Sequence, residues 1–278
     1  MNLRRKFWQD LALYLITTFG AAVMVFPFLW MVSTSLKQHA YVIENPPRLL
    51  PPDPTLENFV KAWAANNFQL YFRNSLIVAI ITTSFAVLFP AMVAYAFARF
   101  EFPGKEIIFY ALLLTLMIPG LTLIIPQFLL AKALHLRNSL WGLIIVYTAT
   151  FIPLNSFLLR GFFEGLPREL EEAVLIDGGG YLTIFLRIVL PLSKPALATV
   201  AIFSFLFSWD EYVWSLTAID DVSKRTLPVA IALFQGQHGT EWGLVFAASL
   251  IAAIPVVAVF VSMQRYFMSG LTSGAFKG

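Results

Sequence analysis

Long apolar runs separated by short polar stretches dominate the pattern along the chain. Runs of about 20 residues match the hydrocarbon thickness of a bilayer when they are helical. They lack the period-two alternation of barrel strands, and a segment surrounded by lipid must satisfy its own backbone hydrogen bonds, so we expect helices. Six spans are predicted, at about 11–36, 74–98, 107–131, 140–160, 194–217 and 243–264.

The composition agrees with this pattern. Of the 278 residues, 59% are hydrophobic and 13% charged, whereas a soluble domain has roughly 45–50% apolar and about 25% charged residues. We therefore expect an all-α, polytopic membrane protein, with residues 1–278 forming a single transmembrane domain. The absence of cysteine excludes disulfides, thiolate metal sites and cysteine nucleophiles. A net charge of +3 without a basic stripe fits contact with membrane lipid and argues against a nucleic-acid partner.

The basic residues set the expected orientation. Arg4, Arg5 and Lys6 precede the first span and favour a cytoplasmic N-terminus. The first apolar run is too long for a signal peptide and has no obvious small-residue cleavage site, so we expect a retained helix. Six spans then place both termini in the cytoplasm. A long external loop, about 37–73, ends in TLENFVKAW, which predicts a short surface helix. This loop would either receive an external partner or close the top of the bundle.

The loop at 161–193, between spans four and five, predicts two short cytoplasmic helices. In LPRELEEAVLIDG a proline near the start, acids in the first turns and a glycine after the last apolar residue are typical of helix ends. Its apolar side would comprise Leu166, Leu170, Ala173 and Val174. After a glycine hinge at 178–180, YLTIFLRIVLP has helical spacing that Pro191 interrupts. Interfacial helices are the alternative, but an acidic face fits a protein partner better than anionic lipid.

The spacing of this loop resembles the EAA loop of bacterial ABC importer permeases. The family pattern is EAA, three residues, G, nine residues, I, one residue, LP. The chain matches it with Glu172, Ala173, Gly178, Ile188, Leu190 and Pro191. It departs at Val174, where the family usually has alanine. LPLSKPAL, WDEY at 209–212 and the ending QRYFMSGLTSGAFKG are similar to the carbohydrate-uptake, maltose permease type, and the resemblance extends from the first span to the last residue.

The resemblance implies a role and a set of partners. The loop would dock on a cytoplasmic ATPase, with Glu172 in a polar contact, Ala173 and Gly178 in close packing, and the IxLP residues fixing the second arm. The full docking set is Glu171, Glu172, Ala173, Asp177, Gly178, Ile188, Leu190 and Pro191. Two such ATPases, a second related permease and an external solute-binding protein would complete the assembly, in a bacterial cytoplasmic (inner) membrane.

The chain has no phosphate-binding loop of the form GxxxxGK[ST]. We therefore expect no enzyme activity and no cofactor in this chain, with ATP and magnesium bound by the partner ATPase. His39, His135 and His238 lack metal-ligand spacing, so no metal site is expected.

A second candidate site lies near the outer end of the fifth span. Carboxylates within an apolar run are costly and suggest function, and flat aromatic faces beside them suit a sugar. The candidate substrate-pathway residues are Trp209, Asp210, Glu211 and Tyr212. The alternative is an aromatic belt at the interface, with both acids already hydrated.

These observations favour the permease subunit of an ATP-driven, binding-protein-dependent sugar importer, forming half of the translocation pathway. The alternative from another class is an ion-coupled secondary carrier in which Asp210 and Glu211 titrate. No strong internal repeat supports that carrier. A third possibility is a non-transporting scaffold that recruits a cytoplasmic protein through the loop.

Overall fold

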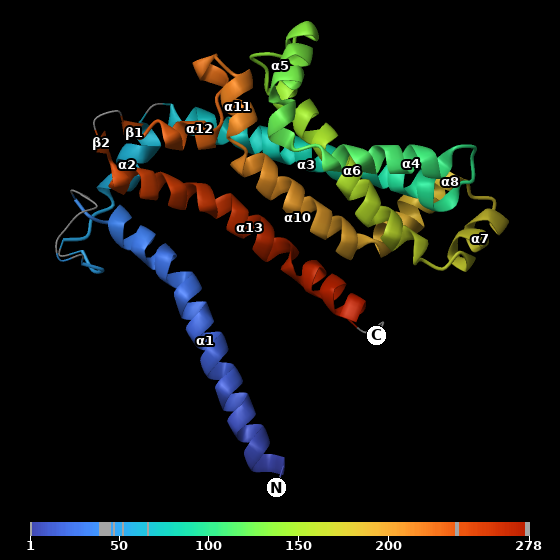
Figure 1. The fold of residues 1–278 in the computed structure, drawn as a ribbon, viewed down its shortest axis with the longest axis horizontal. Coiled ribbons are helices and arrows are strands. Elements are labelled where there is room, and N and C mark those ends of the chain that lie inside the picture. Colours follow the sequence, from blue (N-terminus) through green and yellow to red (C-terminus); the bar gives the residue numbers. More distant parts are fainter. Residues whose placement is uncertain are drawn as a thin grey trace. The chain divides into compact units, whose positions relative to one another are not determined.

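The computed structural model describes residues 2–38, 46, 48–51, 53–65, 67–236 and 239–275, and it is almost entirely helical (Figure 1). The expected all-α class is confirmed. The chain divides into two compact units, Met1–Gln69 with Ala230–Ala253, and Leu70–Val229 with Ile254–Gly278. Each unit is described by itself.

The first unit contains the N-terminal helix and the predicted surface helix. Helix α1 (Asn2–Ser35) covers the first predicted span, and its apolar stretch is unburied within the chain. Helix α2 (Glu57–Ala64) confirms the short helix predicted in TLENFVKAW, and its position on the membrane surface stays a prediction. Asn58 ties the two together, because its buried amide donates to the carbonyls of Ser35 at 2.9 Å and Lys37 at 2.8 Å.

The rest of this unit comes from the C-terminal third of the chain. Two short strands, β1 (Gln235–Gly236) and β2 (Gly239–Thr240), pair antiparallel before helix α13 (Trp242–Ala275). Helix α12 (Leu227–Ala232) and α13 both cross the boundary between the units.

Three long helices form the centre of the second unit: α3 (Phe68–Arg99), α6 (Leu140–Glu164) and α10 (Lys194–Asp210). Asn155 on α6 lies buried between the other two, donating to the carbonyl of Ala86 on α3 at 2.8 Å and to the Ser204 hydroxyl on α10 at 3.1 Å. Hydrogen bonds of this kind hold helices together where lipid gives them no hydrophobic reason to associate. Figure 1 shows α5 and α11 at one end of this unit and α7 at the other.

The third predicted span, 107–131, is not one continuous helix. It comprises α4 (Lys105–Leu114), the 3-10 turns η1 (Thr115–Met117) and η2 (Gly120–Leu123), and α5 (Ile124–Ala133). The two halves meet at 95°. Pro119 explains the break, because a residue before proline is forced out of the helical region, and Ile118 has φ −88° and ψ 118°.

The fifth predicted span, 194–217, also has different bounds. Helix α10 ends at Asp210, Glu211 and Tyr212 are not helical, and α11 (Val213–Ala218) is a separate helix. Among the described residues, four helices are long and apolar enough to cross a membrane, and the number rises to six if each of two bent pairs counts as one span.

The second arm of the 161–193 loop leads into α10 through one of these bends. Helix α8 (Tyr181–Ile184), the π turn η3 (Phe185–Val189) and α9 (Leu190–Leu192) form one helical segment, which meets α10 at 78°. The helical segment ends at Leu192, one residue after the expected interruption at Pro191, which lies inside α9. The π turn just before it relieves the mismatch, because proline lacks the N–H of an α-helical bond and crowds the carbonyl four residues earlier.

Loops after α5 and α11 interlock at the other end of this unit. The side-chain oxygen of Asn138, at φ 52°, accepts the N–H groups of Asp220 at 2.6 Å and Asp221 at 3.0 Å. Arg137 pairs with the Asp220 carboxylate at 2.5 Å. Two hydrogen bonds from Ser223, at the turn η4 (Val222–Lys224), lower the pKa of Asp221 below its usual value. These hydrogen bonds and this ion pair therefore hold the loops after α5 and α11 against each other.

Candidate functional site

Helix α7 (Glu169–Ile176) forms the first arm of the loop at 161–193, which is called the coupling loop from here on. The chain leaves α6 at Gly165, and Pro167 precedes the new helix. Three carboxylates in the first turn, Glu169, Glu171 and Glu172, favour helix formation because they face the positive end of the helix dipole.

Two glycines close α7 with a fixed turn. Gly178 has φ +80°, and its N–H bonds to the carbonyl of Leu175 at 3.1 Å, while the N–H of Gly179 bonds to the carbonyl of Val174 at 2.8 Å. This pair of bonds is the Schellman motif, which requires a left-handed residue after the helix. A β-carbon on Gly179 would lie 2.5 Å from a Val174 methyl group and 2.9 Å from its carbonyl oxygen. The glycines join the two arms as predicted, and their hydrogen bonds hold the junction in one conformation.

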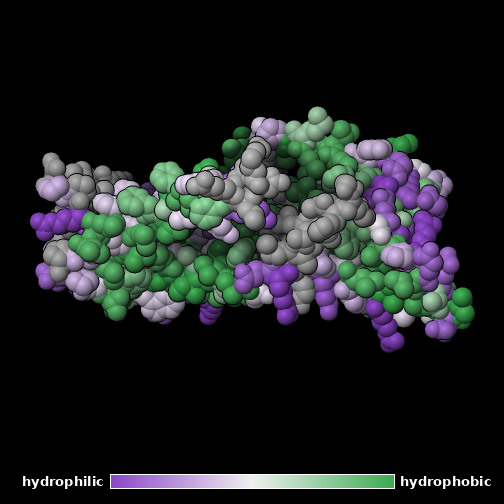
Figure 2. Space-filling model, turned by 90° about the horizontal axis from the view of Figure 1, so that it is seen from below, coloured by the Kyte–Doolittle hydropathy of each residue, from purple (hydrophilic) through white to green (hydrophobic). Residues whose placement is uncertain are grey.

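The outer face of α7 combines carboxylates with apolar side chains. The Glu172 side chain is exposed, and its carboxylate forms no hydrogen bond or ion pair within the described residues. Ala173 and Asp177 are exposed beside it. Ile176 is 85% exposed. Figure 2 shows hydrophilic and hydrophobic side chains side by side at the right-hand end of its view, where Figure 1 places α7.

The predicted apolar side of α7 is only half buried against the chain. Leu166 and Val174 pack against the core cluster, while Leu170 and Ala173 are exposed. The predicted apolar side is therefore covered by the chain at Leu166 and Val174 and left open at Leu170 and Ala173. What remains outside is a mixed surface, suited to a protein partner.

The second arm is anchored by apolar packing. Ile184, Phe185 and Val189 are buried in the core cluster, and Ile188 and Leu190 pack against it. Among the residues assigned to docking, Ile188 and Leu190 therefore face their own bundle. Pro191 is exposed.

Glu171 also points toward its own chain. Its carboxylate lies 2.5 Å from Nε of Arg99, the last residue of α3, with the two side chains 13% and 5% exposed. Arg99 also donates through Nη2 to the carbonyl of Leu166 at 3.0 Å. Arg99 does not stand out in the sequence, because a basic residue at the end of a span is ordinary and only the fold brings it to α7. A docking role for Glu171 stays a prediction.

The four substrate-pathway candidates do not face one surface. Trp209 is 2% exposed and packs on Phe205, with ring centres 5.8 Å apart, and on Phe72, at 5.6 Å. Asp210 and Tyr212 are exposed, and the Asp210 carboxylate forms no hydrogen bond within the part of the chain that the structure describes. The set is therefore divided between the core and the surface.

Glu211 lies between α10 and α11 and stabilises the start of α11. Its carboxylate accepts the Tyr147 hydroxyl, the N–H of Trp214 at 2.7 Å and the N–H of Ser215 at 3.1 Å. These backbone groups belong to the first turn of α11, whose N–H groups have no partner within the helix. The carboxylate thus has a structural role as a helix cap.

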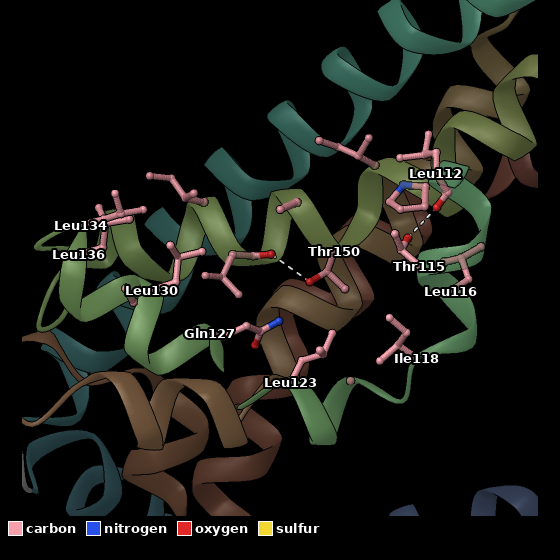
Figure 3. Close-up of a pocket in the computed structure, with 17 residues that line it drawn as sticks. Leu112, Thr115, Leu116, Ile118, Leu123, Gln127, Leu130, Leu134, Leu136 and Thr150 are labelled. Carbon is pink, nitrogen blue, oxygen red and sulfur yellow. Dashed lines mark hydrogen bonds between the residues drawn. The ribbon is translucent and has the colours of Figure 1, made fainter. Parts of the chain in front are cut away.

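A cavity of about 560 Å³ lies between the broken helix α4–α5 and α6 (Figure 3). Its lining is mostly aliphatic, and the polar side chains are Thr115, Gln127 and Thr150. The two threonines are already bonded within their helices, to the carbonyls of Leu112 at 2.7 Å and Val146 at 2.9 Å. The cavity exists because the chain bends at Pro119, a feature that the hydropathy pattern concealed. None of the four substrate-pathway candidates lines it.

The described residues contain no group of three or more side chains that could hold a metal ion. His135 lies in the turn after α5 with φ 54°. His39 and His238 lie outside the described residues.

Known transport proteins match this chain along most of its length. The family model described as binding-protein-dependent transport system inner membrane component matches residues 86–273. The trehalose/maltose transport system permease protein MalG of Thermococcus litoralis is 37% identical over 261 residues, covering 93% of each chain. The sulfoquinovosyl glycerol transport system permease protein SmoH of Agrobacterium fabrum is 35% identical over 254 residues, covering 91% of this chain and 89% of the relative.

The fold is also found among solved structures. A chain of a bacterial ABC transporter involved in the import of the acidic polysaccharide alginate superimposes with a TM-score of 0.81 at 22% identity. The match covers 95% of this chain and 98% of the other.

Proposed function

The chain belongs to the family of binding-protein-dependent transport system inner membrane components, as a carbohydrate ABC permease, and we propose that it imports sugar with energy from a separate ATPase. In this proposal it forms half of the translocation pathway, and an external binding protein delivers the cargo. Relatives named for trehalose, maltose, diacetylchitobiose and galactooligosaccharides support a sugar or a close polar relative as cargo.

The observation that carries the proposal is the outer face of α7. Glu172 and Ile176 are exposed there, on a helix whose end is fixed by a glycine turn. An exposed acid beside an exposed large apolar side chain fits a protein interface, with the apolar residue supplying buried area and the acid supplying orientation. The sequence contains no phosphate-binding loop of its own, so ATP and magnesium are assigned to the partner.

The loop geometry explains how movement of an ATPase would reach the spans. The second arm packs against the core and continues into α10, and the first arm follows directly from α6. A rigid-body displacement of the loop therefore pulls on two spans of the bundle at once. Rocking of packed helices of this kind exchanges inward and outward access to a central path.

Family membership supports the remaining partners and the location that we propose. A second related permease would complete the pathway, and two ATPase subunits would bind the two permeases. We place the chain in a bacterial inner membrane with both termini in the cytoplasm. Loop 161–193 then faces the ATPase, and α2 lies on the side of the binding protein.

The ion-coupled alternative has less support from the structure. A titrating carboxylate must exchange protons with the transport path, whereas Glu211 caps α11 and accepts three hydrogen bonds. Asp210 alone would have to carry that role.

A pull-down tests the proposal. The tagged chain is extracted from its native membrane in mild detergent, beside the variants Glu172→Lys and Glu101→Lys, and its partners are identified by mass spectrometry. Glu101 is an exposed acid at the same predicted membrane face, so its variant controls for the change of charge. We expect an ATPase and a second permease with the wild type and Glu101→Lys, and loss of the ATPase with Glu172→Lys. A wild-type chain that emerges without any ATPase would refute the proposal.

A further inference from the structure

The end of α3 contacts the coupling loop without being connected to it along the chain. Helices α4, α5 and α6 separate Arg99 from residues 161–193 in sequence. Nevertheless the Arg99 guanidinium binds two groups in and beside the first arm, the Glu171 carboxylate at 2.5 Å and the Leu166 carbonyl at 3.0 Å. Two contacts from one planar group restrict both the position and the rotation of α7.

This ion pair is part-buried and more enclosed than the other ion pairs at this end of the bundle. The side chains of Arg99 and Glu171 are 5% and 13% exposed, whereas Glu101, paired with Lys105 at 2.9 Å, is 85% exposed. Loss of one partner from such an enclosed pair leaves a poorly hydrated charge without compensation, which is more disruptive than loss of a surface pair. The Arg99–Glu171 pair can therefore hold two elements in a fixed arrangement.

The first arm has few other contacts with the bundle. Only Val174 within α7, and Leu166 just before it, pack against the core cluster. The second arm is held differently, by the buried side chains of Ile184, Phe185 and Val189. The orientation of α7 thus depends on Arg99 together with the glycine turn that joins α7 to the second arm.

The same end of α3 also contacts the second arm, through aromatic rings. Phe100 lies 4.9 Å from Tyr181 and Tyr95 lies 5.2 Å from Phe185, between ring centres. Residues 95–100 therefore touch both arms. A displacement of the loop must either move α3 or break these contacts.

We infer that Arg99 is a positioning residue: through Glu171 it couples the loop to α3, so that ATPase movement drives this span as well as the two that the loop joins covalently. The inference rests on the proposed function and adds a transmission route to it. It gives adjacent acids opposite roles, since Glu172 faces the ATPase and Glu171 holds the loop to its own bundle.

Variants in the assembled transporter test this role. The complex is purified and reconstituted with Glu171→Gln, Arg99→Gln, the exchange Arg99→Glu with Glu171→Arg, and the control Glu169→Gln, an exposed acid on the same helix. ATPase content, ATP hydrolysis and sugar uptake per ATP are measured. We expect both single variants to retain the ATPase and to lose roughly tenfold in uptake per ATP, with partial recovery in the exchange and no effect in the control.

A distance measurement gives a readout that misfolding would not mimic. The chain has no cysteine, so spin labels can be placed at will, one pair at Ile77 on α3 and Ile145 on α6, another at Leu158 on α6 and Phe203 on α10. Vanadate trapping should change both distances in the wild type. In Glu171→Gln with bound ATPase, the α3 pair should lose its change and the α6–α10 pair should keep it.

Three results would overturn the inference and leave the proposed function standing. These are wild-type uptake per ATP in either single variant, loss of the ATPase from Glu171→Gln as from Glu172→Lys, or an unaltered α3 displacement. Failure of the proposed function looks different, because the wild-type chain would then be recovered without an ATPase.

Discussion

Replacing Gly178 with valine is predicted to distort the end of α7 and weaken ATPase binding. Gly178 has φ +80°, where a β-carbon meets the following carbonyl, and a β-branched side chain is the least tolerated there. Beyond Gly178 and its two chain neighbours no heavy atom lies within 4 Å of the β-carbon position, so any effect arises from local backbone strain and not from a clash with the rest of the bundle. The substitution therefore tests the turn itself.

The expected magnitude follows from this geometry. A left-handed conformation costs an ordinary L-residue about 1–2 kcal/mol, and asparagine tolerates it best after glycine. The order of stability should be glycine, then asparagine, then alanine, then valine at position 178. Gly180 provides the control, because its φ is −100° and its β-carbon position is also open, so Gly180→Ala should be neutral. Gly179→Ala should be worse than Gly180→Ala, since its β-carbon would overlap Val174.

Two assays measure this series. Thermal unfolding of the purified complex reports the strain, and the ATPase recovered in a pull-down reports the geometry of the docking face. We expect both to fall in the order given. If Gly178→Val and Gly180→Ala behave alike in both assays, the Schellman turn does not organise the coupling loop.

Three further predictions concern the bundle. Asn155→Ala removes the hydrogen bonds that join α6 to α3 and α10, and should lower the free energy of unfolding in detergent by about 0.6–1.7 kcal/mol, without changing ATPase recovery. Glu211→Ala removes the cap of α11 and should lower the free energy of unfolding by about 1–2 kcal/mol, measured by thermal unfolding. Sugar uptake by this variant should remain insensitive to an ionophore. Uptake that becomes sensitive to the ionophore would argue for the secondary carrier. Pro119→Ala should straighten α4–α5 and reduce the cavity, measured as slower maleimide labelling of cysteine at Thr150; unchanged labelling would contradict the role given to proline.

The features that depend on local sequence could be predicted. Apolar runs indicated the helices, because backbone groups in lipid leave few other structures. The two arms of the loop followed from helix-end residues, and the glycine junction followed from Gly178. These signals lie within a few residues of the structure that they specify.

Features that depend on tertiary contacts could not be predicted in this way. The partner of Glu171 is 72 residues away in sequence, and nothing around Arg99 indicates it. Trp209 was a reasonable sugar-stacking candidate until the fold placed it beside Phe72 and Phe205. Hydropathy also does not distinguish a straight span from a bent one, so the break at Pro119 was missed although the proline was visible.

The measurement that tests the central claim most directly is uptake by the purified complex in liposomes. Radiolabelled mono-, di- and oligosaccharides are supplied with the external binding protein, with and without ATP and with an ionophore that collapses ion gradients. We predict uptake of a sugar that requires ATP, persists after the gradient collapses and is lost in Glu172→Lys. Uptake that does not depend on ATP and stops when the ion gradient collapses would contradict ATP-driven import and favour a secondary carrier.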